Sequence, residues 1–103
     1  MPSEKFILLE KNIPFQYIDV DKEYVISFSP LTDGEGTYIE EIKGEFASEG
    51  IYKLRERSDG VYLIKESFIE YKIVGYAHSE GIIEEFSLEH SKDKYFKLKR
   101  KTS

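Results

Sequence analysis

The 103-residue chain contains no cysteine and no tryptophan, and its only histidines are His78 and His90. Without cysteine it can form neither disulfides nor thiolate-bound zinc sites. The two histidines lie outside any H-E-x-x-H pattern, so the sequence indicates no metal site built on them. No G-x-S-x-G elbow is present to place a serine beside a base. We therefore expect a non-catalytic protein that uses no cofactor.

Long apolar runs are also lacking. No uninterrupted stretch approaches the roughly 18 residues that a membrane-spanning helix needs. The first residues, MPSEK, do not combine a basic region with an apolar stretch as a signal peptide does. We therefore expect a cytoplasmic protein with no membrane partner. The length fits one domain spanning residues 1–103, and 8 Tyr and 7 Phe can supply a modest core.

Charge is distributed unevenly along the chain. The net charge is −5, with 20 acidic and 15 basic residues, whereas residues 92–103 carry +5 and the preceding residues therefore carry −10. Phosphate neutralisation supplies most of the affinity of nucleic-acid-binding proteins, so the acidic body disfavours such a partner. Enrichment in Lys and Glu is typical both of hyperthermophile proteins and of low-GC mesophiles, which leaves the source open.

A short pattern of Ser, an acidic residue and Gly occurs three times, at 48–50, 58–60 and 79–81, and a looser copy occupies 32–34. Each copy separates runs rich in Tyr, Ile, Phe, Leu and Val, which is typical of hairpins in an antiparallel meander. The expected strands are 15–20, 24–29, 37–46, 51–57, 61–66, 69–78, 82–89 and 94–100.

The turns also suggest a strand register. A three-residue loop at 58–60 pairs Arg57 with Val61 and separates apolar from charged side chains better than a two-residue loop does. The same loop at 48–50 pairs Ala47 with Ile51. On the outer face, Glu45 then lies opposite Lys53 and Glu41 lies opposite Arg57. The core expected from this register consists of Phe28, Ile42, Phe46, Tyr52, Leu54, Tyr62, Ile64 and Ile73.

The N-terminal apolar run has two interpretations. Phe6–Leu9 could form a buried strand, or Ser3 could cap a helix over Glu4–Lys11 that Asn12 ends in a left-handed conformation. Residues 8–15 and 18–21 resemble the first helix and following strand of glutaredoxin-like proteins. The redox cysteine pair of that family is absent, and hairpins follow instead of βαβ units, so no function is inferred from the resemblance.

The stretch Gly60–Tyr71 resembles small barrels of the SH3-like and Sm-like type. The strands after Tyr76 exceed what such a minimal barrel needs, so a larger up-and-down barrel or a two-sheet sandwich is the alternative. We therefore predict an all-β, single-domain antiparallel meander that forms a small barrel or a two-sheet sandwich. It is preceded by a short helix if the helical interpretation of the N-terminus holds.

The function expected from this fold is a non-catalytic protein-interaction module, an adaptor or an inhibitor, that binds a partner protein through loops or a sheet edge. One alternative is a small nucleic-acid-binding barrel that uses the basic C-terminal strand and exposed tyrosines. Another is a barrel that holds a small apolar ligand. The lysines of the last strand are expected to protect an unpaired edge. The candidate partner contacts are Asp33, Glu35, Arg55, Arg57, Lys97, Lys99 and Lys101.

Overall fold

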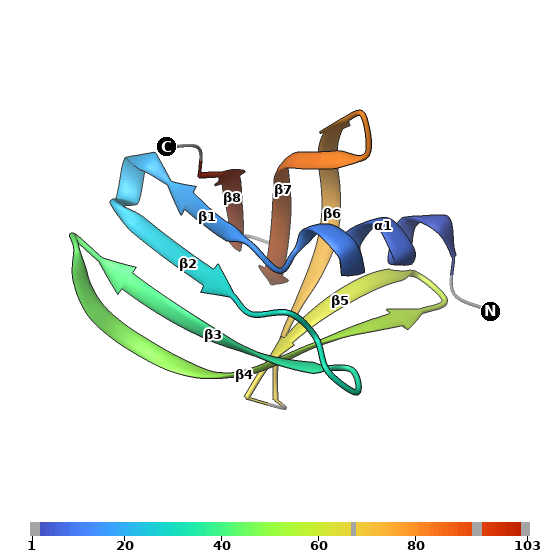
Figure 1. Ribbon diagram of the computed structural model, residues 1–103, viewed down its shortest axis with the longest axis horizontal. Coiled ribbons are helices and arrows are strands. Elements are labelled where there is room, and N and C mark those ends of the chain that lie inside the picture. The colour runs from blue at the N-terminus through green and yellow to red at the C-terminus, as the bar shows by residue number, and fades with distance from the viewer. Residues whose placement is uncertain (1–2, 67, 92–93, 102–103) are drawn as a thin grey trace.

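The computed structural model describes residues 3–66, 68–91 and 94–101. Eight antiparallel strands form a closed barrel in which each strand pairs with the next along the chain and β8 pairs with β1 (Figure 1). The elements are α1 (Glu4–Asn12), β1 (Gln16–Asp19), the 3-10 helix η1 (Val20–Lys22), β2 (Tyr24–Phe28), β3 (Glu35–Ile42), β4 (Glu45–Arg57), β5 (Gly60–Lys65), β6 (Ile69–Ser79), β7 (Ile82–Ser91) and β8 (Lys94–Arg100). This confirms the all-β fold class, and the arrangement is the larger up-and-down barrel and not a sandwich.

Helix α1 begins where the sequence predicts it. The side chain of Ser3 accepts a hydrogen bond from the backbone N–H of Phe6 at 3.1 Å, and Glu4 lies in the first turn, where a negative charge is favourable. The prediction for Asn12 is wrong, because Asn12 is helical and Ile13 follows it in a right-handed conformation. Neither helix of the described residues is long and apolar enough to cross a membrane.

The buried amide of Asn12 joins α1 to the turn between β6 and β7. Its Nδ2 donates to the carbonyl oxygens of Leu8 at 2.9 Å and Gly81 at 3.0 Å. Its Oδ1 accepts from the backbone N–H of Ile83 at 3.1 Å. Because all three bonds are made by one buried side chain, Asn12 fixes how the helix lies against the barrel.

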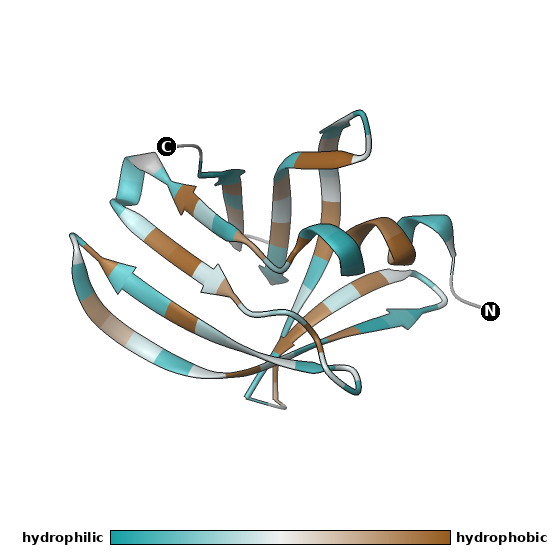
Figure 2. Cartoon of the chain, in the orientation of Figure 1, coloured by the Kyte–Doolittle hydropathy of each residue, from teal (hydrophilic) through white to brown (hydrophobic). Residues whose placement is uncertain are grey.

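The end of the barrel beside α1 is densely packed. Leu9 and Ile13 are fully buried there. Four aromatic rings meet edge to face in the same core, with ring centroids 4.8 Å apart for Tyr17 and Phe86 and also for Phe28 and Tyr52. Figure 2 shows the alternation of hydrophobic and hydrophilic residues along the strands that turns one face of each strand toward this core.

One predicted turn is wrong. Residues 48–50 lie inside β4, and β3 is joined to β4 by Lys43 and Gly44, whose φ angles are 54° and 80°. Two positive φ angles in a two-residue loop fit the twist of a hairpin. Gly50 serves packing instead, since a Cβ there would lie 1.6 Å from Oε1 of Glu66. The glycine therefore makes room for a side chain that crosses the strand.

The predicted register of β4 against β5 is wrong by one residue. Arg57 pairs with Gly60, and Leu54 pairs with Leu63. Because side chains alternate, this shift turns all of β5 over: Val61, Leu63 and Lys65 are buried. The predicted register failed because it was chosen to separate apolar from charged side chains, whereas Lys65 is buried among apolar residues.

The expected core changes accordingly. Four of its eight members belong to the buried core cluster: Phe28, Tyr52, Leu54 and Ile73. Ile64 is also buried, but it lies on the other face of β5 and outside this cluster. Tyr62 is half-buried. Ile42 and Phe46 are exposed to 48% and 65%, because the strand that was expected to end at residue 46 ends at Ile42.

Strand β8 is not an edge strand. It pairs with β7 on one side and with β1 on the other, where Ile18 lies opposite Lys99. The prediction that its lysines protect an unpaired edge is therefore wrong. Residues 92, 93, 102 and 103 of the basic tail lie outside the described residues.

Candidate functional site

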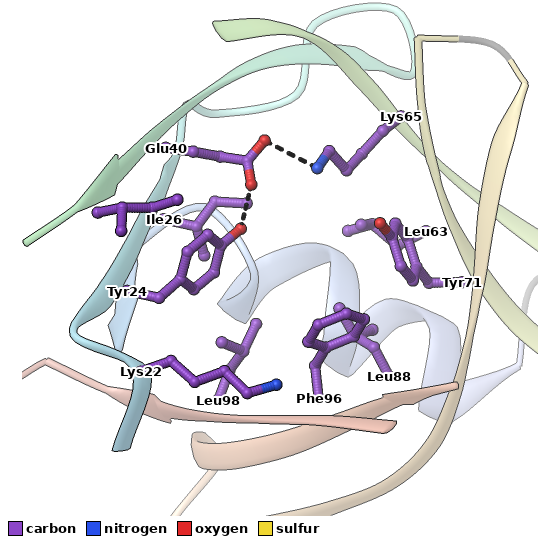
Figure 3. Close-up of a pocket in the computed structure, with 11 residues that line it drawn as sticks. Lys22, Tyr24, Ile26, Glu40, Leu63, Lys65, Tyr71, Leu88, Phe96 and Leu98 are labelled. Carbon is purple, nitrogen blue, oxygen red and sulfur yellow. Dashed lines mark hydrogen bonds and ion pairs between the residues drawn. The ribbon is translucent and has the colours of Figure 1, made fainter. Parts of the chain in front are cut away.

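The barrel interior contains a cavity of about 180 Å³. Side chains from strands on opposite walls converge on it, and in Figure 3 the ribbon of α1 lies beyond it. The apolar part of its lining consists of Ile26, Ile42, Leu63, Leu88, Phe96 and Leu98. Ile42 is 48% exposed, so it lies at the rim, whereas Leu63 is fully buried. The cavity is thus a mostly apolar chamber that opens at one end.

A buried ion pair lies on the wall of this cavity. Nζ of Lys65 on β5 is 2.8 Å from Oε1 of Glu40 on β3, and their side chains are 11% and 14% exposed. The hydroxyl of Tyr24 on β2 donates to Oε2 of Glu40 at 2.5 Å (Figure 3). The hydroxyl of Ser48 on β4 donates to Oε1 at 3.2 Å. Four neighbouring strands thus contribute to one polar cluster.

The protonation states of the cluster follow from these contacts. Burial raises the pKa of Glu40, but the hydrogen bonds from Lys65 and Tyr24 and the charge of Lys65 outweigh it, so the net shift is downward. Burial and the hydrogen bond to Glu40 both raise the pKa of Tyr24. At neutral pH the carboxylate is therefore charged, and the tyrosine hydroxyl remains a donor.

Aromatic rings hold the ammonium of Lys65 in place. Its Nζ lies 4.8 Å from the ring centroid of Tyr38 and 5.7 Å from that of Tyr71, distances typical of cation–π contacts. The hydroxyl of Tyr38 donates to Glu66 at 3.0 Å, which fixes this ring. Among the described residues, Glu40 is the one acceptor within hydrogen-bond distance of Nζ. Lys65 therefore retains donor capacity beside the cavity.

The rim of the cavity carries a second cation. Lys22 of η1 is exposed, and its Nζ lies 4.8 Å from the centroid of the Phe96 ring. An exposed ammonium at this position is screened by solvent, so it influences an entering molecule more weakly than Lys65 does.

The residues predicted as partner contacts lie elsewhere. None of the seven lines the cavity. Asp33 occupies the turn before β3 with a φ of 54°. Arg55 and Arg57 belong to β4, whereas Lys97 and Lys99 belong to β8, four strands away in either direction around the barrel, and Lys101 follows it. The structure therefore does not bring the predicted contacts together on one surface.

Several of the predicted contact residues already form ion pairs. Oε1 of Glu35 lies 3.3 Å from Nζ of Lys53, and Nζ of Lys97 lies 3.3 Å from Oε1 of Glu85. Arg57 forms two hydrogen bonds to Glu70, at 2.7 and 2.9 Å, and its guanidinium stacks over Tyr62. The ion partners predicted for Lys53 and Arg57, which were Glu45 and Glu41, are therefore wrong.

The sequence interpretation did not identify Glu40 or Lys65 as site residues. Each lies in a strand-like run where a charged residue at an alternate position is typical of a solvated face. The one clue is that the register rejected for 51–66 placed charge among apolar side chains. Only the pairing of β3, β4 and β5 shows that an acid and a lysine share the interior.

The outer wall carries an exposed apolar patch on β3 and β4. Ile39, Phe46 and Ile51 are exposed to 42%, 65% and 46%. Glu49 lies opposite Ile39, and Glu41 lies opposite Phe46, so carboxylates border the patch. This combination is a second candidate contact surface.

The chain matches no protein-family model, no curated protein and no solved structure. Within the described ranges, no group of three His, Asp or Glu side chains is placed to hold a metal ion. The function must therefore be argued from the geometry of the cavity and the outer wall.

Proposed function

We propose that this protein binds one small, largely apolar molecule inside the barrel. The observation that carries the proposal is the cavity of about 180 Å³ between apolar walls. Eight strands enclose an interior that is either just filled by side chains or able to hold one small ligand. An apolar cavity of about 150 Å³ holds benzene, so this slightly larger one suits a benzene ring with a short substituent.

The arrangement supports modest affinity without any rearrangement of the strands. The walls are pre-formed by paired strands, and burying apolar ligand surface contributes about 25 cal/mol per Å². A ligand this small reaches dissociation constants of roughly micromolar to millimolar. We place the protein in the cytoplasm as part of the same proposal, since a chain without cysteine needs no oxidising compartment.

Indole is a suitable first probe, and its binding can be measured by NMR titration of the labelled protein. Leu88→Trp fills part of the cavity, and Ile82→Trp introduces the same side chain on the same strand at a position that is 47% exposed. We expect the wild type and Ile82→Trp to bind indole and Leu88→Trp to lose binding. Absence of binding to the wild type, or equal binding by a folded Leu88→Trp protein, would contradict the proposal.

A protein-interaction module is the second candidate, and the exposed patch of Ile39, Phe46 and Ile51 favours it. Because the barrel is closed, such contacts would use this face or the loops, not a sheet edge. The bordering carboxylates suit a partner with basic groups around apolar side chains.

Pull-downs can test this candidate with a patch variant, Phe46→Ser/Ile51→Ser, and a matched outer-wall variant, Val74→Ser/Ile82→Ser. A partner that survives nuclease, is retained by the outer-wall variant and is lost with the patch variant supports it. Partners lost on nuclease digestion would instead favour the nucleic-acid alternative. The structure gives that alternative less support, because Arg57 and Lys97 are paired with carboxylates.

A further inference from the structure

We infer that the ligand is a small monocarboxylate whose carboxylate accepts hydrogen bonds from Lys65 and whose apolar body fills the rest of the cavity. This inference rests on the proposed ligand-binding function and adds the chemical class of the ligand. It follows from which polar groups of the cavity are already satisfied and which are not.

The acceptor side of the cluster is nearly full. Oε1 of Glu40 accepts from Lys65 and Ser48, and Oε2 accepts from Tyr24. A carboxylate has about four lone-pair positions, so three well-placed donors leave little capacity. A ligand that offers only donors, such as an amine, would have to displace one of these internal bonds.

The donor side is not full. An ammonium has three N–H donors, and within the described part of the chain Glu40 accepts only one bond from Lys65. Lys65 lines the cavity, and Figure 3 shows its ammonium directed toward Glu40 and the interior, so the remaining N–H groups are available to a ligand there. A ligand oxygen placed there gains a charge-assisted hydrogen bond in a site that excludes most water.

The charge balance points the same way. The cavity lining contains two lysines, Lys22 and Lys65, and one carboxylate, Glu40, so it carries a surplus of one positive charge in a protein of net charge −5. A monoanion neutralises this surplus, whereas a cation would double it. Because Lys65 is 11% exposed at its side chain and Lys22 is exposed, Lys65 supplies most of the discrimination.

Three probes with the same benzene ring separate ligand class from simple cavity filling: phenylacetate, 2-phenylethanol and 2-phenylethylamine. Each is a benzene ring with a short substituent, the size that the cavity suits. We expect calorimetric or NMR titration to give phenylacetate an affinity at least about tenfold higher than the amine, with the alcohol between them.

The variant that tests Lys65 is Glu40→Gln/Lys65→Met, because removing the lysine alone would leave a buried carboxylate unpaired. The matched control is Glu35→Gln/Lys53→Met, which makes the same two changes in an ion pair on the outer wall. We expect the cavity variant to lose about tenfold in phenylacetate affinity and to bind the alcohol within about threefold of wild type. The control should bind all three probes as the wild type does.

Each other outcome is informative. If the alcohol binds but phenylacetate binds no tighter than the amine, the inference fails and the proposed function stands. The inference also fails if Lys22→Met removes the preference for the acid and the cavity variant keeps it, since the carboxylate would then lie at the rim. If no probe binds, the proposed function fails and the inference fails with it.

Discussion

Lys65 and Glu40 are the residues whose position is hardest to explain by stability alone. Burying two charges requires removing water from both, and apolar residues of similar volume often give an equally stable interior. Here the pair borders a cavity and has donor capacity left over. A binding role accounts for both facts.

The pair makes a prediction about single and double substitutions. Lys65→Met should lower the free energy of unfolding by about 3 kcal/mol, because it leaves the charge of Glu40 buried without a partner. Glu40→Gln/Lys65→Met should lower it by only about 1 kcal/mol, since the amide oxygen can still accept from Tyr24 and the amide N–H can donate to the hydroxyl oxygen of Ser48. Urea denaturation of the three proteins measures both values. Equal losses in the single and double variants would show that Lys65 does not compensate Glu40.

Glu40 also makes a prediction about pH. Its pKa is lowered in the folded protein, so its ionised form stabilises the fold above its ordinary pKa of about 4.3, and this contribution is lost as the pH falls through the lower folded value. The stability advantage of the wild type over Glu40→Gln should therefore shrink below about pH 4. Other carboxyls with lowered pKa values, those of Glu56, Asp59 and Glu70, are present in both proteins and cancel in the difference. An advantage that stays constant from neutral pH to pH 3 would contradict this.

At the scale of elements, the backbone of β3 at Gly36 lies directly against a tyrosine ring of β4. Gly36 pairs with Tyr52, and a Cβ on Gly36 would lie 2.6 Å from Cε1 of that ring. The ring cannot move easily, because Tyr52 is fully buried and its hydroxyl donates to the carbonyl of Ser29 at 2.6 Å.

Gly36→Ala should therefore lower the free energy of unfolding by about 1–3 kcal/mol through overpacking. Gly75→Ala is the matched control, since a Cβ at Gly75 meets nothing within 4 Å. We expect its effect to stay within about 1 kcal/mol in either direction. Thermal or urea unfolding distinguishes the two, and similar losses would show that contact with Tyr52 is not the cause.

The junction of α1 and β7 depends on one side chain. Asn12→Ala removes three hydrogen bonds and leaves the N–H of Ile83 without its acceptor, so it should lower the free energy of unfolding by about 2–3 kcal/mol. Gln16→Ala, which removes the only other side-chain amide and its hydrogen bond to Ser27, should lower the free energy of unfolding by less than about 1 kcal/mol. A larger loss for Gln16→Ala in urea unfolding would contradict this ranking.

The sequence predicted those elements that depend on local chemistry. The cap at Ser3 and the turns at 33–34 and 80–81 could be identified because a short side chain or a glycine is needed at that position. The register of β5 could not be predicted, because we assumed that charged side chains face solvent and the side chain of Lys65 faces the interior. The pairing of β8 with β1 could not be predicted either, because Ile18 and Lys99 are paired in space but lie near opposite ends of the sequence.

The candidate site was hidden for the same reason. Glu40 and Lys65 are 25 positions apart, and nothing local marks them as partners. They meet because the register of β5 against β4 turns Lys65 toward the interior, on the same side as Glu40 of β3. Predicting the site therefore required the correct pairing of three strands.

At the scale of the whole molecule, the two ends of the barrel have different roles. The end beside α1 is filled by Leu9, Ile13 and the aromatic cluster, and it supplies packing. The other end contains the cavity and the ion pair. A barrel built in this way can change its ligand by changing lining residues while the packed end maintains the fold.

This division predicts that stability and binding respond to different substitutions. Leu9→Ala empties part of the packed end, where the leucine is fully buried, so it should lower the free energy of unfolding by about 2–5 kcal/mol. The affinity of the remaining folded protein for indole should stay within about twofold, because Leu9 does not line the cavity. Leu88→Trp should do the reverse: it should abolish indole binding while changing stability less than Leu9→Ala, since the larger ring enters a hollow and not a packed region. Urea unfolding and indole titration of both variants provide the test. If Leu9→Ala weakened binding as strongly as it weakened folding, the two ends would form one coupled core, and the cavity would be a packing defect instead of a site.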